Sequence, residues 1–236
     1  MSQFSPVFTF WEGPMPAYIK ICMATWDIMT PYTVLNYGNL HNYTDLPIDD
    51  RLKRFSLAQI ADVVRAHVLR DHGGYWMDAD TILFSPKRMD TMMIGNREDR
   101  TQTIGYLFAK EPRMDLYEKW AAYQDGVLND PNASHHWSVM GNMFTDKYVM
   151  EHKEVTIGDV RKCWPETYMI PGDRPRMQKY QRFYFQKSYN LVDIMQTDML
   201  MLHNSWTPGW YKQMSEDEVL KHGCTMSNMI RRALQY

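Results

Sequence analysis

The chain has 236 residues, of which 44% are hydrophobic and 23% charged, so it can bury a substantial core and is not expected to be disordered. Its net charge of −2 gives no basic field for nucleic acid, and no Lys/Arg block suggests binding to a membrane surface. Three scattered cysteines, Cys22, Cys163 and Cys224, favour a reducing compartment over a disulfide framework or a zinc site.

The start of the chain predicts neither export nor a membrane span. The segment MSQFSPVFTFWEGP lacks a basic start and a long apolar core, so we expect no signal peptide. No window reaches the ~18 apolar residues that a membrane span needs. No repeat, low-complexity tract or linker divides the chain, so we expect a single domain.

The first elements predict the opening of a parallel sheet. Residues 7–11 form a β-rich run, a helix is expected from Pro16 to about Met29, and residues 32–37 form a second strand. Residues 39–55 are a polar connection with a short helix near Asp49. A strand, a helix and a strand in this order favour an open α/β sheet, whose ligands gather at the carboxyl ends of the strands.

Residues 55–86 carry the most informative pattern. An apolar-periodic helix is followed by Gly73-Gly74, a short strand over residues 75–77, and the acidic pair Asp78 and Asp80. The small Ala79 between the two carboxylates lets the chain turn, so that both can reach one ligand. Such a pair suits a hard divalent cation, Mg²⁺ or Mn²⁺, whose remaining positions are filled by water and phosphate oxygens.

The rest of the chain alternates between short strands, helices and turns. We expect strands at 91–94, 103–109, 155–160 and 199–202, helices at 113–123, 136–150 (interrupted at Gly141-Asn142) and 216–234, a turn-rich stretch at 126–134, and a long irregular segment at 163–184.

The central stretch resembles the sugar-binding region of DXD-containing glycosyltransferases of the capsular polysaccharide synthesis type, glycosyltransferase family 32, which has bacterial and large-DNA-virus members. Asp62 and Arg65 match the helix pattern S-D-x-x-R of these enzymes, with Ala61 where they usually have Ser. The following pattern, L-x-x-x-G-G-x-Y/W-x-D-x-D, is matched by Leu69, Gly73, Gly74, Trp76, Asp78 and Asp80. Further anchors are residues 10–13 and 203–206.

This resemblance implies an α/β, GT-A-like (Rossmann-like) fold with a mixed, mostly parallel sheet flanked by helices. The nucleotide-binding part would span residues 1–110, and the acceptor-side and C-terminal part residues 111–236. The implied activity is metal-dependent transfer of a sugar from a UDP-sugar donor to a glycan acceptor, with retention of anomeric configuration. We expect no nucleic-acid partner and a cytoplasmic location, in the host cytoplasm if the source is viral.

The resemblance also implies the residues that hold the metal and the donor. Asp78, Asp80 and His203 would bind Mn²⁺ or Mg²⁺, although a His beside a Trp is also an ordinary structural residue. Asp62 would accept hydrogen bonds from sugar hydroxyls and Arg65 would contact the sugar or diphosphate; a plain ion pair on the helix surface is the alternative.

The nucleotide would lie where the first two strands end. There Phe10, Trp11 and Glu12 would cradle the uridine, with Tyr37 and Asn39 as weaker candidates, although Phe10 is equally well explained as a core aromatic. Gly74 and Ala79 allow close backbone approach. Trp206 is a candidate lid and Lys212 a candidate diphosphate contact, and His135, His136 and Trp137 lie where relatives have an acceptor-side loop.

Two other functions fit parts of the pattern. Residues 78–81, DADT, match the nucleophile motif of haloacid-dehalogenase-like phosphatases, but the strand before them is short and no later acidic pair follows a strand. A non-catalytic carbohydrate-binding module would explain the 14% aromatic content but not the adjacent carboxylates.

Overall fold

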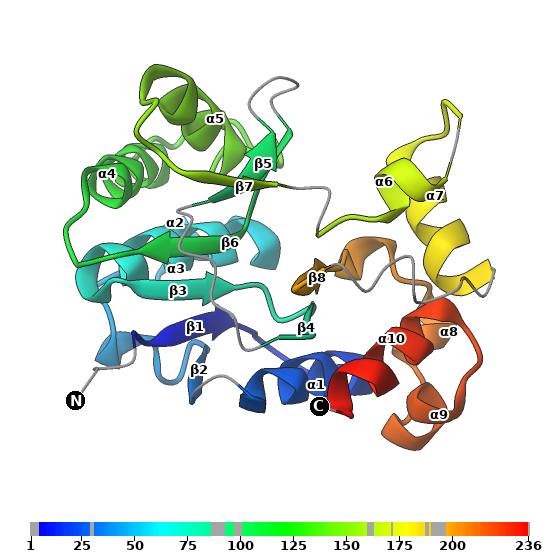
Figure 1. Ribbon diagram of the computed structural model, residues 1–236. Helices are drawn as coiled ribbons and strands as arrows, with labels where there is room; N and C mark the ends of the chain where they lie inside the picture. The colour runs from blue at the N-terminus through cyan, green and yellow to red at the C-terminus, as the bar shows by residue number, and fades with distance from the viewer. Residues whose placement is uncertain are drawn as a thin grey trace. The chain divides into compact units, whose positions relative to one another are not determined.

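The computed structural model describes residues 5–28, 31–85, 93–96, 101–159, 163–170, 172–186, 189 and 197–235 (Figure 1). Their contacts group into two compact units. Unit 1 comprises Met1–Gly13, Pro31–Asp78 and Met89–Gly158, and unit 2 comprises Pro14–Thr30, Ala79–Arg88 and Asp159–Tyr236. The predicted ends of elements at Met29, residues 91–92 and residue 160 lie outside the described residues. The single domain expected from the sequence, with a nucleotide-binding part at 1–110 and an acceptor-side part at 111–236, stays a prediction.

The main sheet has the strand order β2-β1-β3-β6-β5-β7. Strand β1 pairs in parallel with β2 and β3, whereas β6 pairs antiparallel with β3 and β5, so the sheet is mixed. The strands are β1 (Val7–Phe10), β2 (Tyr32–Leu35), β3 (Gly74–Met77), β5 (Met93–Asn96), β6 (Thr101–Ala109) and β7 (Ile157–Asp159). The predicted α/β class, a sheet flanked by helices, is confirmed (Figure 1).

Helix α3 (Leu57–His72) is the central helix of unit 1. A capping box starts it, in which the Ser56 hydroxyl accepts from the Gln59 amide and the Gln59 side chain accepts from the Ser56 amide. It packs on β1, β3 and β6, and α4 (Asp115–Asn129) packs against it. The apolar face of α3 is fully buried, and the burial of each large side chain stabilises the fold by about 1.5–3 kcal/mol.

The chain leaves α3 through two glycines in the left-handed region. Gly73 has a φ of 64° and Gly74 a φ of 90°, and a Cβ at Gly74 would collide with the carbonyl of Pro6. The turn therefore requires glycine, and it brings β3 directly alongside β1. The smaller helices of unit 1 are α2 (Asp50–Lys53) and α5 (Asn142–Glu151).

Unit 2 is built around the antiparallel pair β4 (Thr81–Leu83) and β8 (Met199–Met201). Helices α1 (Ala17–Ala24) and α10 (Thr225–Leu234) both contact β4. The other helices are α6 (Glu166–Met169), α7 (Arg176–Gln181), which continues into a π-helical turn, α8 (Gly209–Lys212) and α9 (Glu216–Lys221). None of the helices described in either unit has the length and apolarity needed to cross a bilayer.

Four predicted elements were wrong in extent. Helix α4 runs through Gly126 to Asn129 instead of ending at residue 123, because Leu128 is buried and an exposed glycine costs a helix only about 1 kcal/mol. Helix α5 begins only at Asn142, after turns. The predicted irregular segment at 163–184 contains α6 and α7, and the C-terminal helix is divided into α9 and α10 at residues 222–224.

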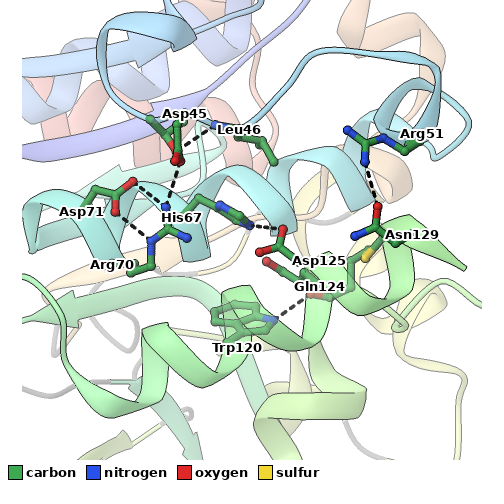
Figure 2. A network of polar contacts seen from close by, with 12 residues as sticks. Asp45, Leu46, Arg51, His67, Arg70, Asp71, Trp120, Gln124, Asp125 and Asn129 are labelled. Carbon is green, nitrogen blue, oxygen red and sulfur yellow. Dashed lines mark hydrogen bonds and ion pairs between the residues drawn. The ribbon is translucent and has the colours of Figure 1, made fainter.

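A buried histidine lies where α3 meets α4. Figure 2 shows His67 of α3 directed at Asp125 of α4, with 3.6 Å between Nε2 and Oδ1, while Arg70 pairs with Asp45 and Asp71 on the same helix face. His67 is 2% exposed, and burial lowers its pKa to about 4 even though Asp125 opposes the shift. The fold therefore holds this imidazole in its neutral form.

This neutral histidine predicts a pH dependence of stability. Because the pKa of His67 is about 4 in the folded chain and near 6.5 when unfolded, the unfolded chain binds more protons between these values. The contribution of neutral His67 to the free energy of unfolding is complete above pH 6.5 and is lost as the pH falls toward 4. The total loss is about 2–3 kcal/mol. His67→Leu should flatten this part of the urea-unfolding free energy measured from pH 4 to 7. The exposed His41→Leu is the control, and equal slopes in all three proteins would contradict the assignment.

Candidate functional site

One buried guanidinium organises the polar residues of unit 1. Arg65 is 4% exposed, and its Nη2 lies 3.1 Å from Asp62 Oδ1 and 3.0 Å from Asp78 Oδ1. Its Nη1 donates to the carbonyl of Ile104 and its Nε to that of Ala61. Asp78 Oδ1 also accepts from Trp76 Nε1 at 2.9 Å. The predicted pair of Asp62 and Arg65 is therefore joined to Asp78 in one cluster.

The two carboxylates of this cluster share a single cation. Burial raises the pKa of Asp62 to about 7, the nearby charge of Asp78 adds to the rise, and Arg65 only partly opposes it. Asp62 can therefore hold or release a proton near neutral pH, so it can both donate to and accept from a ligand hydroxyl.

Gly141 lies against Asp62. A Cβ at this position would stand 2.8 Å from Asp62 Oδ2 and 2.5 Å from Ile104 Cδ1. The backbone there is fixed, because the carbonyl of Met140 accepts from Trp120 Nε1 at 2.8 Å and from Gln124 Nε2 at 2.6 Å. Gln124 also donates to the Asp62 carbonyl. Sequence reasoning missed the positioning role of Trp120 and Gln124, which gives no local signal because it depends on contact between α4 and α3.

The ends of β1 and β2 gather the residues predicted to cradle a nucleotide. Glu12 Oε2 accepts from the Tyr37 amide at 2.9 Å, and the Asn39 side chain fastens the turn that follows β2. Phe10 is buried against Tyr37 in the hydrophobic core, which agrees with its interpretation as a core aromatic. Trp11 Nε1 is buried and has no hydrogen-bond partner among the described residues, which is uncommon for a buried N–H group.

In unit 2, Asp80 adjoins the segment that begins at His203. The amide of Leu202 donates to the Asp80 carbonyl at 3.1 Å, and the amide of Asn204 donates to Asp80 Oδ2 at 2.7 Å. This follows from the pairing of β4 with β8, which sets residues 80 and 202 opposite each other. Tyr18 of α1 fixes the side chain of Asn204 with a further hydrogen bond of 2.5 Å. The structure therefore brings together Asp80 and the predicted histidine segment.

His203 lies among aromatic rings and beside a cation. Its ring centre is 5.6 Å from that of Trp164, stacked on it, and 3.9 Å from that of Trp206. Its Nε2 is 3.3 Å from Nη2 of Arg176, the first residue of α7. Burial, and after it the charge of Arg176, lower the pKa of His203 to about 3. The imidazole is therefore neutral. Sequence reasoning missed Trp164 and Arg176, because they lie in the segment predicted to be irregular.

The remaining candidates have less specific surroundings. The side chain of Lys212 makes no hydrogen bond or ion pair with the described residues. His135 stacks on Phe55, with ring centres 4.8 Å apart, and Trp137 is 70% exposed. Close to them, α4 and residues 130–139 line a cavity whose wall includes Tyr123 and Asp130.

The boundary between the two units falls inside the acidic motif. Asp78 is the last residue of its segment in unit 1, and Ala79 begins the next segment of unit 2. Within the described residues, no three His, Cys, Asp or Glu side chains are grouped closely enough to hold a metal ion by themselves.

One comparison with known proteins, with models of protein families, agrees with the motif. A family model described as capsular polysaccharide synthesis protein matches residues 2–156, which include the Arg65 cluster but not His203. No curated protein is significantly similar to the chain. Among solved structures, the apo-form glycosyltransferase GlyE of Streptococcus pneumoniae TIGR4 matches at 11% identity and a TM-score of 0.40. That match covers 98% of this chain, which spans 63% of the length of GlyE.

The close contact at Gly141 gives a test of the unit 1 cluster. In Gly141→Ala the new methyl group must displace Asp62 or Ile104, so we expect a loss of about 1–3 kcal/mol in the free energy of urea unfolding. Gly126→Ala is the matched control, because a Cβ there meets nothing within 4 Å, and it should stabilise α4 by about 0.5–1 kcal/mol. Equal stability of Gly141→Ala and the unchanged chain would show that Asp62 is not held against Gly141.

Proposed function

Since the chain belongs to the capsular polysaccharide synthesis family, we propose that it is a metal-dependent glycosyltransferase that moves a sugar from a UDP-sugar donor to a glycan acceptor. The observation that carries this proposal is the cluster of Asp62, Arg65 and Asp78, which lies within the matched residues. A half-buried carboxylate that titrates near neutral pH, fixed beside a second one, suits recognition of sugar hydroxyls.

Each residue of the cluster has a distinct proposed role. Asp62 binds hydroxyl groups of the donor sugar. Arg65 acts as a positioning residue, because its donors are already engaged by Ala61, Ile104 and the two carboxylates. Asp78 contributes through the ribose, the metal ion or its waters, with Oδ1 held in place by Arg65 and Trp76.

The nucleotide end of the donor is proposed to bind at β1 and β2. The unpartnered N–H of Trp11 can donate to a carbonyl of the base, and the ring of Tyr37 beside Phe10 offers an aromatic surface. Glu12 has its carboxylate fixed by the Tyr37 amide, so it orients this loop.

Asp80 fits the metal ion that the proposal requires. It is a half-buried carboxylate held by the amide of Asn204, and oxygen ligands of this kind suit Mg²⁺ and Mn²⁺. His203 fits less well, since its Nε2 accepts from Arg176 and a cation lies beside it. When bound, the divalent ion would neutralise the charge that grows on the diphosphate as the bond to the sugar breaks.

The proposed reaction proceeds with retention of configuration. The bond between the anomeric carbon and the diphosphate oxygen breaks, and a bond from that carbon to an acceptor hydroxyl oxygen forms on the same face. The hydroxyl proton passes to the departing phosphate oxygen, so no covalent enzyme intermediate is required. The cavity beside α4, with Tyr123 and Asp130 in its wall, offers an aromatic ring and a carboxylate for the glycan acceptor.

Product analysis distinguishes the proposal from its alternatives. Mass spectrometry after incubation with a panel of UDP-sugars, Mn²⁺ and simple saccharide acceptors should show a product one sugar unit heavier, and proton NMR of its anomeric signal should show retention. Release of inorganic phosphate without transfer would indicate a phosphatase. Glycan binding that a chelator does not change, with no transfer, would indicate a binding module.

Replacing Asp80 tests the metal directly. Asp80→Asn removes the charge but keeps an oxygen for the Asn204 amide, so the free energy of unfolding should stay within about 0.5 kcal/mol. Transfer should fall by about a hundredfold or more, and calorimetry should show that Mn²⁺ no longer strengthens UDP binding. The exposed Asp173→Asn serves as control and should behave like the unchanged chain. Unchanged turnover in Asp80→Asn would refute the assignment.

A further inference from the structure

The guanidinium of Arg176 lies between two tryptophan rings, which is unusual for an arginine of a surface helix. Its guanidinium carbon stands 3.6 Å from the ring centre of Trp164 and 5.6 Å from that of Trp206, so both rings flank it. It is half-buried, and its Nε is buried with no hydrogen-bond partner in the described part of the chain. Aromatic faces hold a guanidinium by its plane and leave its edge N–H groups for other partners.

The contact between Arg176 and His203 fixes the direction of their hydrogen bond. A guanidinium has only donors, so His203 Nε2, at 3.3 Å from Nη2, must accept. A neutral imidazole that accepts at Nε2 carries its proton on Nδ1. The pair therefore presents N–H groups and no acceptor: the remaining donors of Arg176 and the Nδ1–H of His203.

A fixed set of donors with a positive charge is complementary to an anion. Glu166, whose charge acts on Arg176, is 0% exposed, and burial raises its pKa to about 7, so it only partly offsets the positive charge of Arg176 near neutral pH. The Asp80 carboxylate accepts from the amide of Asn204, the residue that follows His203 in the chain. A carboxylate proposed to bind a metal ion, close to an anion site, suits a ligand that binds cations through its phosphate oxygens.

From this geometry we propose that Arg176 and His203 bind the diphosphate of the donor, and that His203 acts as a hydrogen-bond donor through Nδ1 and not as a metal ligand. This inference rests on the proposed function and specifies how unit 2 holds the leaving group. Arg176 would contact the phosphate oxygens directly, so it belongs among the residues that touch the substrate. Trp164 and Trp206 position it by stacking.

The test compares ligands that differ only in their phosphates. Calorimetry with UDP, UMP, uridine and inorganic pyrophosphate, each with Mn²⁺, should show that Arg176→Gln weakens UDP and pyrophosphate about ten- to a hundredfold, as expected for a lost charged hydrogen bond. Its uridine affinity should change less than twofold. Arg176→Lys keeps the charge without the planar fork, so its affinities for UDP and pyrophosphate should lie between those of the unchanged chain and those of Arg176→Gln. The control is the exposed Arg174→Gln, two residues earlier, which should bind all four ligands normally.

A second pair of variants separates the two roles of His203. An Asn side chain reproduces the Nδ1 donor of histidine, so His203→Asn should keep most of the UDP affinity, whereas His203→Ala should lose it about tenfold. Titration with Mn²⁺ alone should give the same affinity for both variants and the unchanged chain. A tenfold or larger loss of Mn²⁺ affinity in both variants would identify a metal ligand and overturn the proposal.

The outcomes also separate this inference from the proposed function. If the unchanged chain binds UDP and Arg176→Gln, shown to be folded by its circular dichroism, binds it equally well, the anion site is wrong and the transferase proposal stands. If the unchanged chain binds pyrophosphate through Arg176 but not UDP, the anion site stands and the uridine donor is wrong. If Arg176→Gln lowers thermal stability but leaves the ratio of UDP to uridine affinity unchanged, Arg176 is structural only.

Discussion

The position of the polar residues in unit 1 depends on one buried cation. A guanidinium that is 4% exposed would destabilise the fold unless its charge and its donors were satisfied, and Arg65 meets both needs through two carboxylates and two carbonyls. Those partners come from α3, from the end of β3 and from β6. Removing Arg65 would leave two carboxylates close together without a counter-charge, so the cation determines where Asp62 and Asp78 can lie.

The same constraint explains the unusual titration of Asp62. One positive charge cannot fully stabilise two neighbouring negative ones, and Asp62 is the more deeply buried of the two carboxylates. Burial raises the pKa of Asp62 to about 7, Arg65 only partly opposes this rise, and the charge of Asp78 adds to it. Asp78 Oδ1 accepts from Trp76 Nε1 and pairs with Arg65. A carboxyl group in this state can adapt to a ligand hydroxyl as either donor or acceptor.

The two units offer complementary chemistry. Unit 1 presents carboxylate oxygens, which suit the hydroxyl groups of a sugar, and unit 2 presents the donors of Arg176 and His203, which suit phosphate oxygens. Aromatic residues accompany both sets, with Trp76 lying 5.0 Å from the Arg65 guanidinium and Trp164 stacked on Arg176. In each unit a tryptophan ring lies against the guanidinium of the arginine.

The sequence by itself determined the α/β class, most of the elements and the family, and it predicted Asp62, Arg65, Asp78 and Asp80 as candidate site residues. These depend on local information: hydrophobic periodicity, the two glycines that end α3, and residues three or two positions apart in the chain. Only the tertiary structure decided that Arg65 joins Asp62 to Asp78, that Gly141 lies against Asp62, and that Arg176 meets His203. These contacts join residues from 13 to 79 positions apart, and they form because strand pairing and helix packing bring those segments together, which no local pattern records.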